Sequence, residues 1–182
     1  MSAEDLGFTT RAIHAGDAAN STRAAVTPIF QSATYTFATA AEGAAMFAGD
    51  APGHVYARWG NPNVAELEAK VAALEGAEDA VAAASGMAAI STVLLALLRA
   101  GDHCIVDPAC YSATVTLFRQ ELPRLGIEPT FVDTGDLEAV AAAVRPSTRL
   151  IYTETPGNPT LKLVDLAALA AFARERGITT VC

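Results

Sequence analysis

Helical and strand patterns of hydrophobicity alternate along the chain from residue 61 onward, and this alternation limits the fold more than any other feature. Strands are predicted at 79–84, 103–106, 130–132, 149–154 and 178–182, and helices at 62–75, 87–99, 111–122, 136–144 and 165–176. Parallel strands need long crossover connections, and a helix after each strand supplies them. The pattern therefore predicts an α/β fold, with a mostly parallel sheet and helices on both of its faces.

The first 60 residues have a different character from the rest. A capping box from Thr39 to Glu42 predicts one short helix that ends at Gly49, and the remainder reads as extended. Such a segment cannot bury a core by itself, so it must pack on its own domain or on a partner subunit. We therefore expect an extended N-terminal arm over residues 1–60 and the N-terminal part of a truncated large domain over residues 61–182.

Charge and cysteine content argue against several classes of partner. The net charge is −8 and the arginines are scattered, so there is no electrostatic footprint for nucleic acid or for an anionic membrane. The longest apolar run, Ala88–Leu98, is far shorter than the roughly 20 residues of a membrane span, and the acidic start at residues 1–5 is unlike a secretory signal. The three cysteines show no C-x-x-C spacing, which favours a reducing, cytoplasmic setting over a disulfide framework or a zinc site.

The turn Ser85–Gly86–Met87 joins a strand pattern to a strongly apolar helix pattern. Free backbone N–H groups and the positive end of the dipole make a helix start an anion site. A glycine there lets a phosphate approach the backbone closely. The same turn packs a helix on a sheet in many α/β proteins, so this motif alone leaves both interpretations open.

The chain carries a series of motifs in a fixed order: TRAIHAG at 10–16, YARWGNP at 56–62, LEG at 74–76, SGM at 85–87, GD at 101–102, Tyr111 and ETPGNP at 154–159. This ordered series resembles the Cys/Met-metabolism, or trans-sulfuration, family of pyridoxal 5′-phosphate (PLP) enzymes. Segments 44–49 and 53–56 look most like the methionine γ-lyase and cystathionine γ-lyase/γ-synthase branch. The resemblance implies PLP as cofactor and the aspartate-aminotransferase-like fold (fold type I), with its large domain incomplete in this chain.

The resemblance also implies how the phosphate of PLP is bound. Gly86 and Met87 match residues that donate backbone N–H groups to it, and Ser85 belongs to the same turn. Tyr56 and Arg58 match a pair that reaches the phosphate from the neighbouring subunit, and an arginine fork suits a phosphate dianion. The family pattern therefore implies a homo-oligomer, a dimer of dimers. Without the other motifs, Tyr56 and Arg58 would read as an ordinary surface pair.

Tyr111 and Asn158 match residues on the ring side of the cofactor. Tyr111 matches the catalytic tyrosine that stacks on the ring and passes a proton to the departing sulfur, and Asn158 matches the asparagine that hydrogen-bonds the 3′-oxygen. A tyrosine packed in the core and an Asn-Pro turn without chemistry are the alternatives. Glu154 is expected to support the site by pairing with an arginine. The histidines form no metal pattern, and His103 is expected to be a turn or packing residue.

Two departures from the family pattern qualify the expected activity. Ala113 stands where methionine γ-lyases commonly have cysteine, which puts methionine in doubt as the substrate. PLP chemistry also needs a lysine and an acid for the pyridinium nitrogen, and neither Lys70 nor Lys162 matches the position of the family's lysine. The chain stops in a strand pattern at Cys182, which is a poor natural terminus and indicates a piece of a longer protein.

The sequence leaves three functions open. The parent protein is expected to catalyse γ-elimination from a sulfur amino acid, as a PLP-dependent carbon–sulfur lyase. The alternative is γ-replacement on an O-acylhomoserine, and the third reading is a non-catalytic fragment that self-associates when expressed alone. A dinucleotide-binding protein would need G-x-G-x-x-G after a strand, and that motif is absent.

Overall fold

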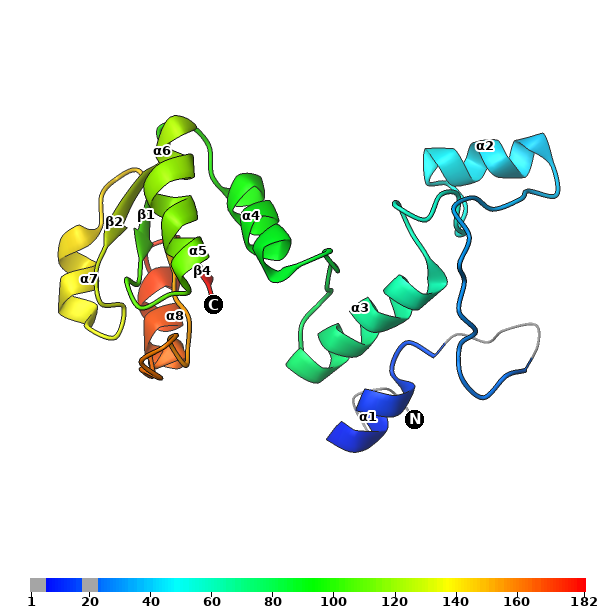
Figure 1. Ribbon diagram of the computed structural model, residues 1–182, viewed down its shortest axis with the longest axis horizontal. Coiled ribbons are helices and arrows are strands. Elements are labelled where there is room, and N and C mark those ends of the chain that lie inside the picture. The colour runs from blue at the N-terminus through cyan, green and yellow to red at the C-terminus, as the bar shows by residue number, and fades with distance from the viewer. Residues whose placement is uncertain (1–5, 18–22) are drawn as a thin grey trace. The chain divides into compact units, whose positions relative to one another are not determined.

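The computed structural model describes residues 6–17 and 23–182 and divides the chain into two compact units, Met1–Ala82 and Ala83–Cys182 (Figure 1). We call them the N-terminal unit and the C-terminal unit. The acidic start at residues 1–5 lies outside the described residues.

The C-terminal unit is built on a four-stranded sheet whose strands are all parallel. The strands are β1 (His103–Val106), β2 (Glu128–Phe131), β3 (Thr148–Tyr152) and β4 (Thr179–Val181), in the spatial order β2-β1-β3-β4. These are the four strands predicted between 103 and 182, and their parallel pairing confirms the predicted α/β sheet. The central strand β1 is buried at every position, as expected for a parallel strand covered on both faces.

Helices cover both faces of this sheet. The first face carries α4 (Gly86–Leu97) and one continuous helical rod made of α5 (Ser112–Thr116), a π-helical stretch (Leu117–Glu121) and α6 (Leu122–Arg124). The second face carries α7 (Leu137–Ala143) and α8 (Leu166–Arg174).

Alternate residues of the strands serve two separate hydrophobic cores. Cys104 and Val106 pack with Phe118 of the rod in the first core, whereas Ile105 packs with Val140 and Leu169 in the second. All six side chains are fully buried. The period-two alternation of strand side chains thus builds a doubly covered sheet from nearly continuous apolar runs.

The strand predicted at 79–84 does not form. Residues 79–83 have no regular structure, their side chains are largely exposed, and no described strand pairs with them. A strand is stable only with a hydrogen-bonded neighbour, and the alanines at 82–84 have low intrinsic β propensity. The helix after this segment begins as predicted, because the Ser85 hydroxyl accepts a hydrogen bond from the Ala88 N–H (3.1 Å).

The described residues of the N-terminal unit form three helices, α1 (Phe8–His14), α2 (Ala40–Ala48) and α3 (Pro62–Glu75). The cap of α2 is the predicted one, since the Thr39 hydroxyl accepts from the Glu42 N–H (3.1 Å). The helix α1 contradicts the prediction of a single helix in the first 60 residues. It forms against α3, where the Arg11 guanidinium donates to the Ala73 carbonyl (2.8 Å). These contacts group α3 with the N-terminal segment, although the sequence pattern assigns it to the large domain.

Very little of the N-terminal unit is buried. Within its described part, Ala15, Gly43 and Ala72 are the buried residues. Large apolar side chains are exposed instead: Phe8, Ile13, Val26, Ile29, Phe47 and Trp59. In the described ranges, no helix has the length and hydrophobicity that a membrane crossing needs.

Candidate functional site

Polar side chains follow the first three strands of the sheet at the points where those strands end. Asp107 follows β1, Thr134 lies three residues beyond β2, and Thr153 and Glu154 follow β3. The carboxyl ends of parallel strands share one edge of the sheet, which is where open α/β sheets bind their ligands. This edge is therefore the candidate location of a ligand site.

A cleft of about 870 Å³ opens beside this edge, and two of the predicted site residues line it. Tyr111 lies at the start of α5 and its side chain is half-exposed, while Asn158 comes from the loop after β3. The two residues are 47 positions apart in the sequence, and the fold brings both to the lining of the same cleft. The Asn158 side chain is exposed and makes no hydrogen bond with any described residue, so its amide is available to a ligand.

Glu154 holds Tyr111 in place, but not in the way expected from the sequence. One carboxylate oxygen accepts a hydrogen bond from the Tyr111 backbone N–H (2.8 Å), and the other accepts one from the buried Tyr152 hydroxyl (3.2 Å). The predicted arginine partner is therefore wrong. The helix start supplies a free N–H donor that no side chain of its own segment caps. Burial is the largest cause that raises the pKa of Tyr152, and the negative charge of the neighbouring Glu154 carboxylate is the second. The Tyr152 hydroxyl therefore stays protonated and donates its hydrogen bond.

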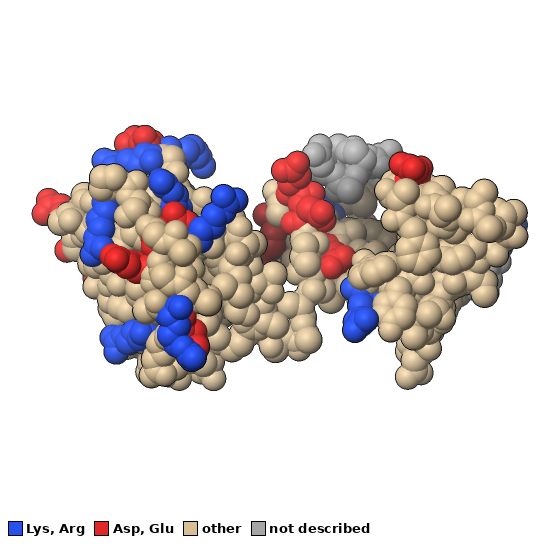
Figure 2. Space-filling view, turned by 90° about the horizontal axis from the view of Figure 1, so that it is seen from above, with Lys and Arg blue, Asp and Glu red and all other residues tan. Residues whose placement is uncertain are grey.

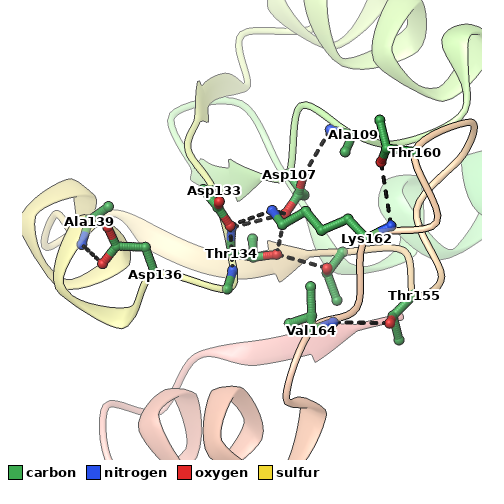
Figure 3. Close-up of polar contacts among 12 residues, drawn as sticks. Asp107, Ala109, Asp133, Thr134, Asp136, Ala139, Thr155, Thr160, Lys162 and Val164 are labelled. Carbon is green, nitrogen blue, oxygen red and sulfur yellow. Dashed lines mark hydrogen bonds and ion pairs between the residues drawn. The ribbon is translucent and has the colours of Figure 1, made fainter.

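Asp107 is the centre of a buried polar network at the same edge (Figure 3). It accepts hydrogen bonds from the Ala109 N–H (2.8 Å), from the Thr134 N–H (2.9 Å) and from the Thr134 hydroxyl (2.6 Å), which also contacts the Thr153 hydroxyl (2.8 Å). Burial alone would raise the pKa of Asp107, but these hydrogen bonds and the Lys162 ammonium outweigh it and lower that pKa. The buried carboxylate is therefore charged and fully paired.

Lys162 reaches this network from the far end of the loop that follows β3. Its ammonium lies 2.9 Å from Asp107 and also contacts Asp133, and Figure 3 shows the side chain extended between the two carboxylates. Partial burial would lower the pKa of Lys162, and hydrogen bonds to Asp133 and Asp107 raise it instead. The lysine is thus held as a cation.

The start of α4 presents the predicted phosphate-binding amides. The N–H groups of Gly86 and Met87 donate to none of the described residues, and the space beside Gly86 is open, since a Cβ there would meet nothing within 4 Å. The Met87 sulfur lies 3.9 Å from the hydroxyl of Thr114 in α5, the helix whose N-cap is Tyr111. The Ser85 hydroxyl caps this helix by accepting a hydrogen bond from the Ala88 N–H.

Tyr56 and Arg58 lie together in the N-terminal unit. The Arg58 guanidinium carbon is 5.0 Å from the centre of the Tyr56 ring, and that ring packs edge-on against Trp59 (6.2 Å). Together with Phe37 and Phe47, these three residues border a hollow of about 490 Å³.

On the face shown in Figure 2, the region around α2 carries few charged side chains, whereas Lys and Arg alternate with Asp and Glu over the C-terminal unit.

Two side chains of β1, His103 and Cys104, serve packing rather than chemistry. His103 is buried, and its ring nitrogens contact the hydroxyls of Thr148 and Thr130, both at 2.8 Å, so its packing role is confirmed. Burial is the largest cause that lowers the pKa of His103, and the positive charge of the nearby Arg145 is the second. Both favour the neutral ring. Burial raises the pKa of Cys104 to about 12, so this thiol is a core group. The described residues contain no cluster of three or more metal-ligating side chains.

The family described as Cys/Met metabolism PLP-dependent enzyme matches residues 9–182. The chain belongs to this family. The PLP-dependent chemistry that the motifs imply is thereby confirmed at the level of the family.

Curated relatives of the chain include enzymes of both expected reaction types. An L-methionine gamma-lyase of Porphyromonas gingivalis is 44% identical over 178 residues, which cover 96% of this chain and 45% of the relative. An O-succinylhomoserine sulfhydrylase of Pseudomonas aeruginosa is 42% identical over 174 residues, covering 96% and 43%. The chain thus spans about half the length of the curated relatives it matches.

Solved structures show the same fold. Cystathionine gamma-lyase from Lactobacillus plantarum, complexed with L-serine, aligns with a TM-score of 0.86 at 38% identity over 96% of this chain and 44% of its own. A structure from Campylobacter jejuni that carries N′-pyridoxyl-lysine-5′-monophosphate aligns with a TM-score of 0.91 at 29% identity, covering 97% and 44%. The predicted fold type I architecture with an incomplete large domain is confirmed.

The donor groups of the C-terminal unit suit two parts of PLP. Unbonded helix-start amides beside open space suit a phosphate, and a cleft with a half-exposed tyrosine ring and an unpaired amide suits a planar, polar ring. Both lysines of the chain are tied into ion pairs, Lys70 with Asp17 and Glu66 and Lys162 with Asp107 and Asp133.

Sequence reasoning missed Asp107 and the role of Lys162. An aspartate directly after a buried strand at the carboxyl edge was an available signal for a site residue. Its partner Lys162 lies 55 residues away, and no local pattern connects the two positions.

Proposed function

We propose that the full-length protein carrying this chain is a PLP-dependent enzyme that eliminates or replaces the γ-substituent of a sulfur amino acid or an activated homoserine. The observation that carries the proposal is the convergence of Tyr111 and Asn158 on one cleft at the carboxyl edge of the sheet. The family resemblance implies that these two residues contact the cofactor ring, and both line this cleft.

Each proposed site residue has a distinct task. The N–H groups of Gly86 and Met87 bind the phosphate, with the dipole of the 12-residue helix α4 behind them. The Asn158 amide donates to the oxygen on the ring of the cofactor. PLP, when bound, withdraws electrons from the α-carbon of the substrate.

Tyr111 is the proposed catalytic residue of this chain. Its ring covers the cofactor, and its hydroxyl gives a proton to the departing sulfur, which would otherwise leave as a poor, charged group. Glu154 contributes by fixing the backbone of Tyr111 through the 2.8 Å hydrogen bond to its N–H. The side chain is then free to face the cleft, because its own backbone is already anchored.

The finer choice of reaction is γ-elimination, with γ-replacement as the alternative. Relatives of both kinds match at nearly equal identity, 44% for a methionine gamma-lyase and 42% for a sulfhydrylase. A panel of sulfur amino acids and O-acylhomoserines, given to the full-length protein with and without a thiol, separates the two. Release of a ketoacid and a thiol from one substrate supports elimination, and product only when an acylhomoserine meets a thiol supports replacement.

Cofactor binding has its own test. We expect the purified full-length protein to show the visible absorbance of lysine-bound PLP and to yield one borohydride-reducible lysine, which peptide mapping locates outside residues 1–182. No absorbance change on PLP addition and no reducible lysine would contradict the assignment.

The protein is further proposed to be a homo-oligomer, a dimer of dimers, in a reducing, cytoplasmic setting. The exposed apolar side chains of the N-terminal unit, such as Trp59 at 74% exposure and Phe47 at 61%, favour burial against another subunit. Free Cys104, Cys110 and Cys182 are compatible with a reducing compartment.

The 182 residues alone are proposed to be inactive. Covalent attachment of PLP needs an amine that can lose its proton, and partner carboxylates raise the pKa of both Lys70 and Lys162. We expect the isolated chain to bind PLP only loosely, to leave no reducible lysine and to self-associate. Turnover of a sulfur amino acid by a monomer of this chain would contradict that expectation.

A further inference from the structure

We propose that Lys162 is a positioning residue for the cofactor site, because it fastens the loop that carries Asn158 to the loop that carries Tyr111. The effect of Lys162 on PLP binding rests on the proposed function, since only a PLP-binding protein would need Asn158 and Tyr111 to be held in register. The fastening itself is a property of the loops and is testable without the cofactor.

Residues of two loops line the same cleft. The first follows β1 and runs from Asp107 to Tyr111, and the second follows β3 and runs from Glu154 to Lys162. Neither loop contains a helix or strand, so its position depends on side-chain contacts. A ligand between them meets a preformed site only if these contacts hold both loops at once.

Two carboxylates, one from each loop, accept a hydrogen bond from the other loop. Asp107 of the first loop accepts from the Lys162 ammonium of the second (2.9 Å), and Glu154 of the second loop accepts from the Tyr111 N–H of the first (2.8 Å). Between these links the backbones touch closely, since a Cβ added to Gly157 would lie 3.0 Å from the Ala109 carbonyl oxygen. Asn158 is the next residue in the chain, so a shift of this contact moves its amide.

Lys162 also closes its own loop. Its carbonyl accepts from the Gly157 N–H (2.8 Å), and the Leu161 N–H donates to the Gly157 carbonyl (2.7 Å). A side chain anchored at Asp107 and Asp133 therefore fixes a short ring of backbone that includes Asn158.

Loss of the lysine is expected to loosen the loop rather than unfold the unit. Without Lys162, Asp107 still has the hydrogen bonds from the Ala109 N–H and from the N–H and hydroxyl of Thr134. The ammonium itself is partly exposed, at 28% for the side chain. Its removal therefore leaves a charged group that is still hydrogen-bonded, which limits the cost in stability.

The test compares Lys162→Met with Lys70→Met in the full-length protein. Lys70 is a matched control because it also lies between two carboxylates, Asp17 and Glu66, at a similar exposure of 19%, but in the N-terminal unit. In the cofactor-free protein, we expect Lys162→Met to speed amide hydrogen exchange in 155–164 and to leave β1 and α3 unchanged. Lys70→Met should speed exchange in α3 only, and Lys162→Arg should restore protection.

PLP affinity then tests the consequence. We expect Lys162→Met to weaken PLP binding by about tenfold and to add nothing further in an Asn158→Ala background, because it acts through Asn158. A purely structural role would give additive losses, which would overturn the proposal, as would unchanged exchange in 155–164. Failure of the unmodified protein to bind PLP would contradict the proposed function instead, and the exchange comparison would still decide whether Lys162 fastens the loop.

Discussion

The two units of the chain differ in how they use their apolar residues. The C-terminal unit buries them in two cores on either side of a parallel sheet, with Leu94, Phe118 and Leu169 at or near zero exposure. The N-terminal unit leaves Phe47 and Trp59 mostly exposed and buries only small residues within its described part. One unit is a self-contained scaffold, and the other is a surface that needs something to cover it.

This difference bears on where the functional groups lie. Tyr111 and Asn158 rest on a rigid scaffold and meet in one cleft. Tyr56 and Arg58 rest on the unit with little core, among exposed aromatic rings. A phosphate-binding arginine on such a surface is useful if another subunit covers that surface, which is the arrangement we propose.

The sharpest contrast between the units is expected from core truncation. Phe118→Ala removes a fully buried ring that packs 5.1 Å from the Tyr152 ring, and we expect it to lower the free energy of unfolding by about 3–5 kcal/mol. Trp59→Ala should change it by less than about 0.5 kcal/mol in dilute protein. Urea unfolding of both variants checks this, and equal losses would refute the contrast.

Arg58→Ala is expected to weaken PLP binding by about 2–4 kcal/mol, because it leaves a phosphate charge without its partner. Arg176→Ala is the matched control, since the Arg176 guanidinium also stacks on an aromatic ring, that of Phe172 in α8, at 3.8 Å from the ring centre. Fluorescence titration with PLP measures both variants. Equal affinities for Arg58→Ala and the unmodified protein would remove Arg58 from the site.

Acid should act on the C-terminal unit through Asp107. The pKa of Asp107 is lower in the folded state, so its stabilisation is present above the unfolded value of about 4 and is lost as pH falls through the folded value. We expect Asp107→Asn to cost about 1–3 kcal/mol at pH 7 and progressively less in acid. Asp17→Asn, at an exposed ion pair of the N-terminal unit, should show little such trend. Parallel pH profiles of the unmodified protein and Asp107→Asn would contradict this.

The smallest expected contrast comes from helix caps. The Asp136 carboxylate accepts from the N–H groups of Glu138 (3.0 Å) and Ala139 (3.1 Å) at the start of α7, so Asp136→Ala should cost about 1 kcal/mol. Thr39→Ala removes a comparable cap from α2, whose unit has little core of its own. Its effect on the main unfolding transition should be smaller, and thermal unfolding distinguishes the two. A larger loss for Thr39→Ala would reverse the comparison.

The contrast between the units also explains which predictions from the sequence succeed. The four strands β1 to β4 are evident because burial on both faces leaves apolar runs, and caps such as Asp136 mark the helix starts. The segment 79–84 carries the same kind of run, but strand formation depends on a neighbour that a single segment does not reveal. The helix α1 is stabilised by α3, roughly 50 residues later, so its own short sequence predicts nothing.

The candidate site divides in the same way. Motif order predicts Gly86, Tyr111 and Asn158, since each belongs to a local pattern. The Lys162–Asp107 ion pair and the link between Glu154 and the Tyr111 N–H join distant segments through single side-chain atoms. Such contacts follow from the packing of the sheet edge, and no local spacing encodes them.

The most direct test of the central claim, that the two units serve different subunits' sites, is complementation between two inactive variants. Full-length Arg58→Ala is mixed with a full-length variant that lacks the catalytic lysine, and the subunits are exchanged by mild denaturation and refolding. If Arg58 reaches a neighbour's phosphate, hybrid dimers regain one intact site and activity returns in proportion to the hybrids formed. No return of activity, with hybrids confirmed by mass spectrometry, would place Arg58 in its own subunit's site and contradict the account.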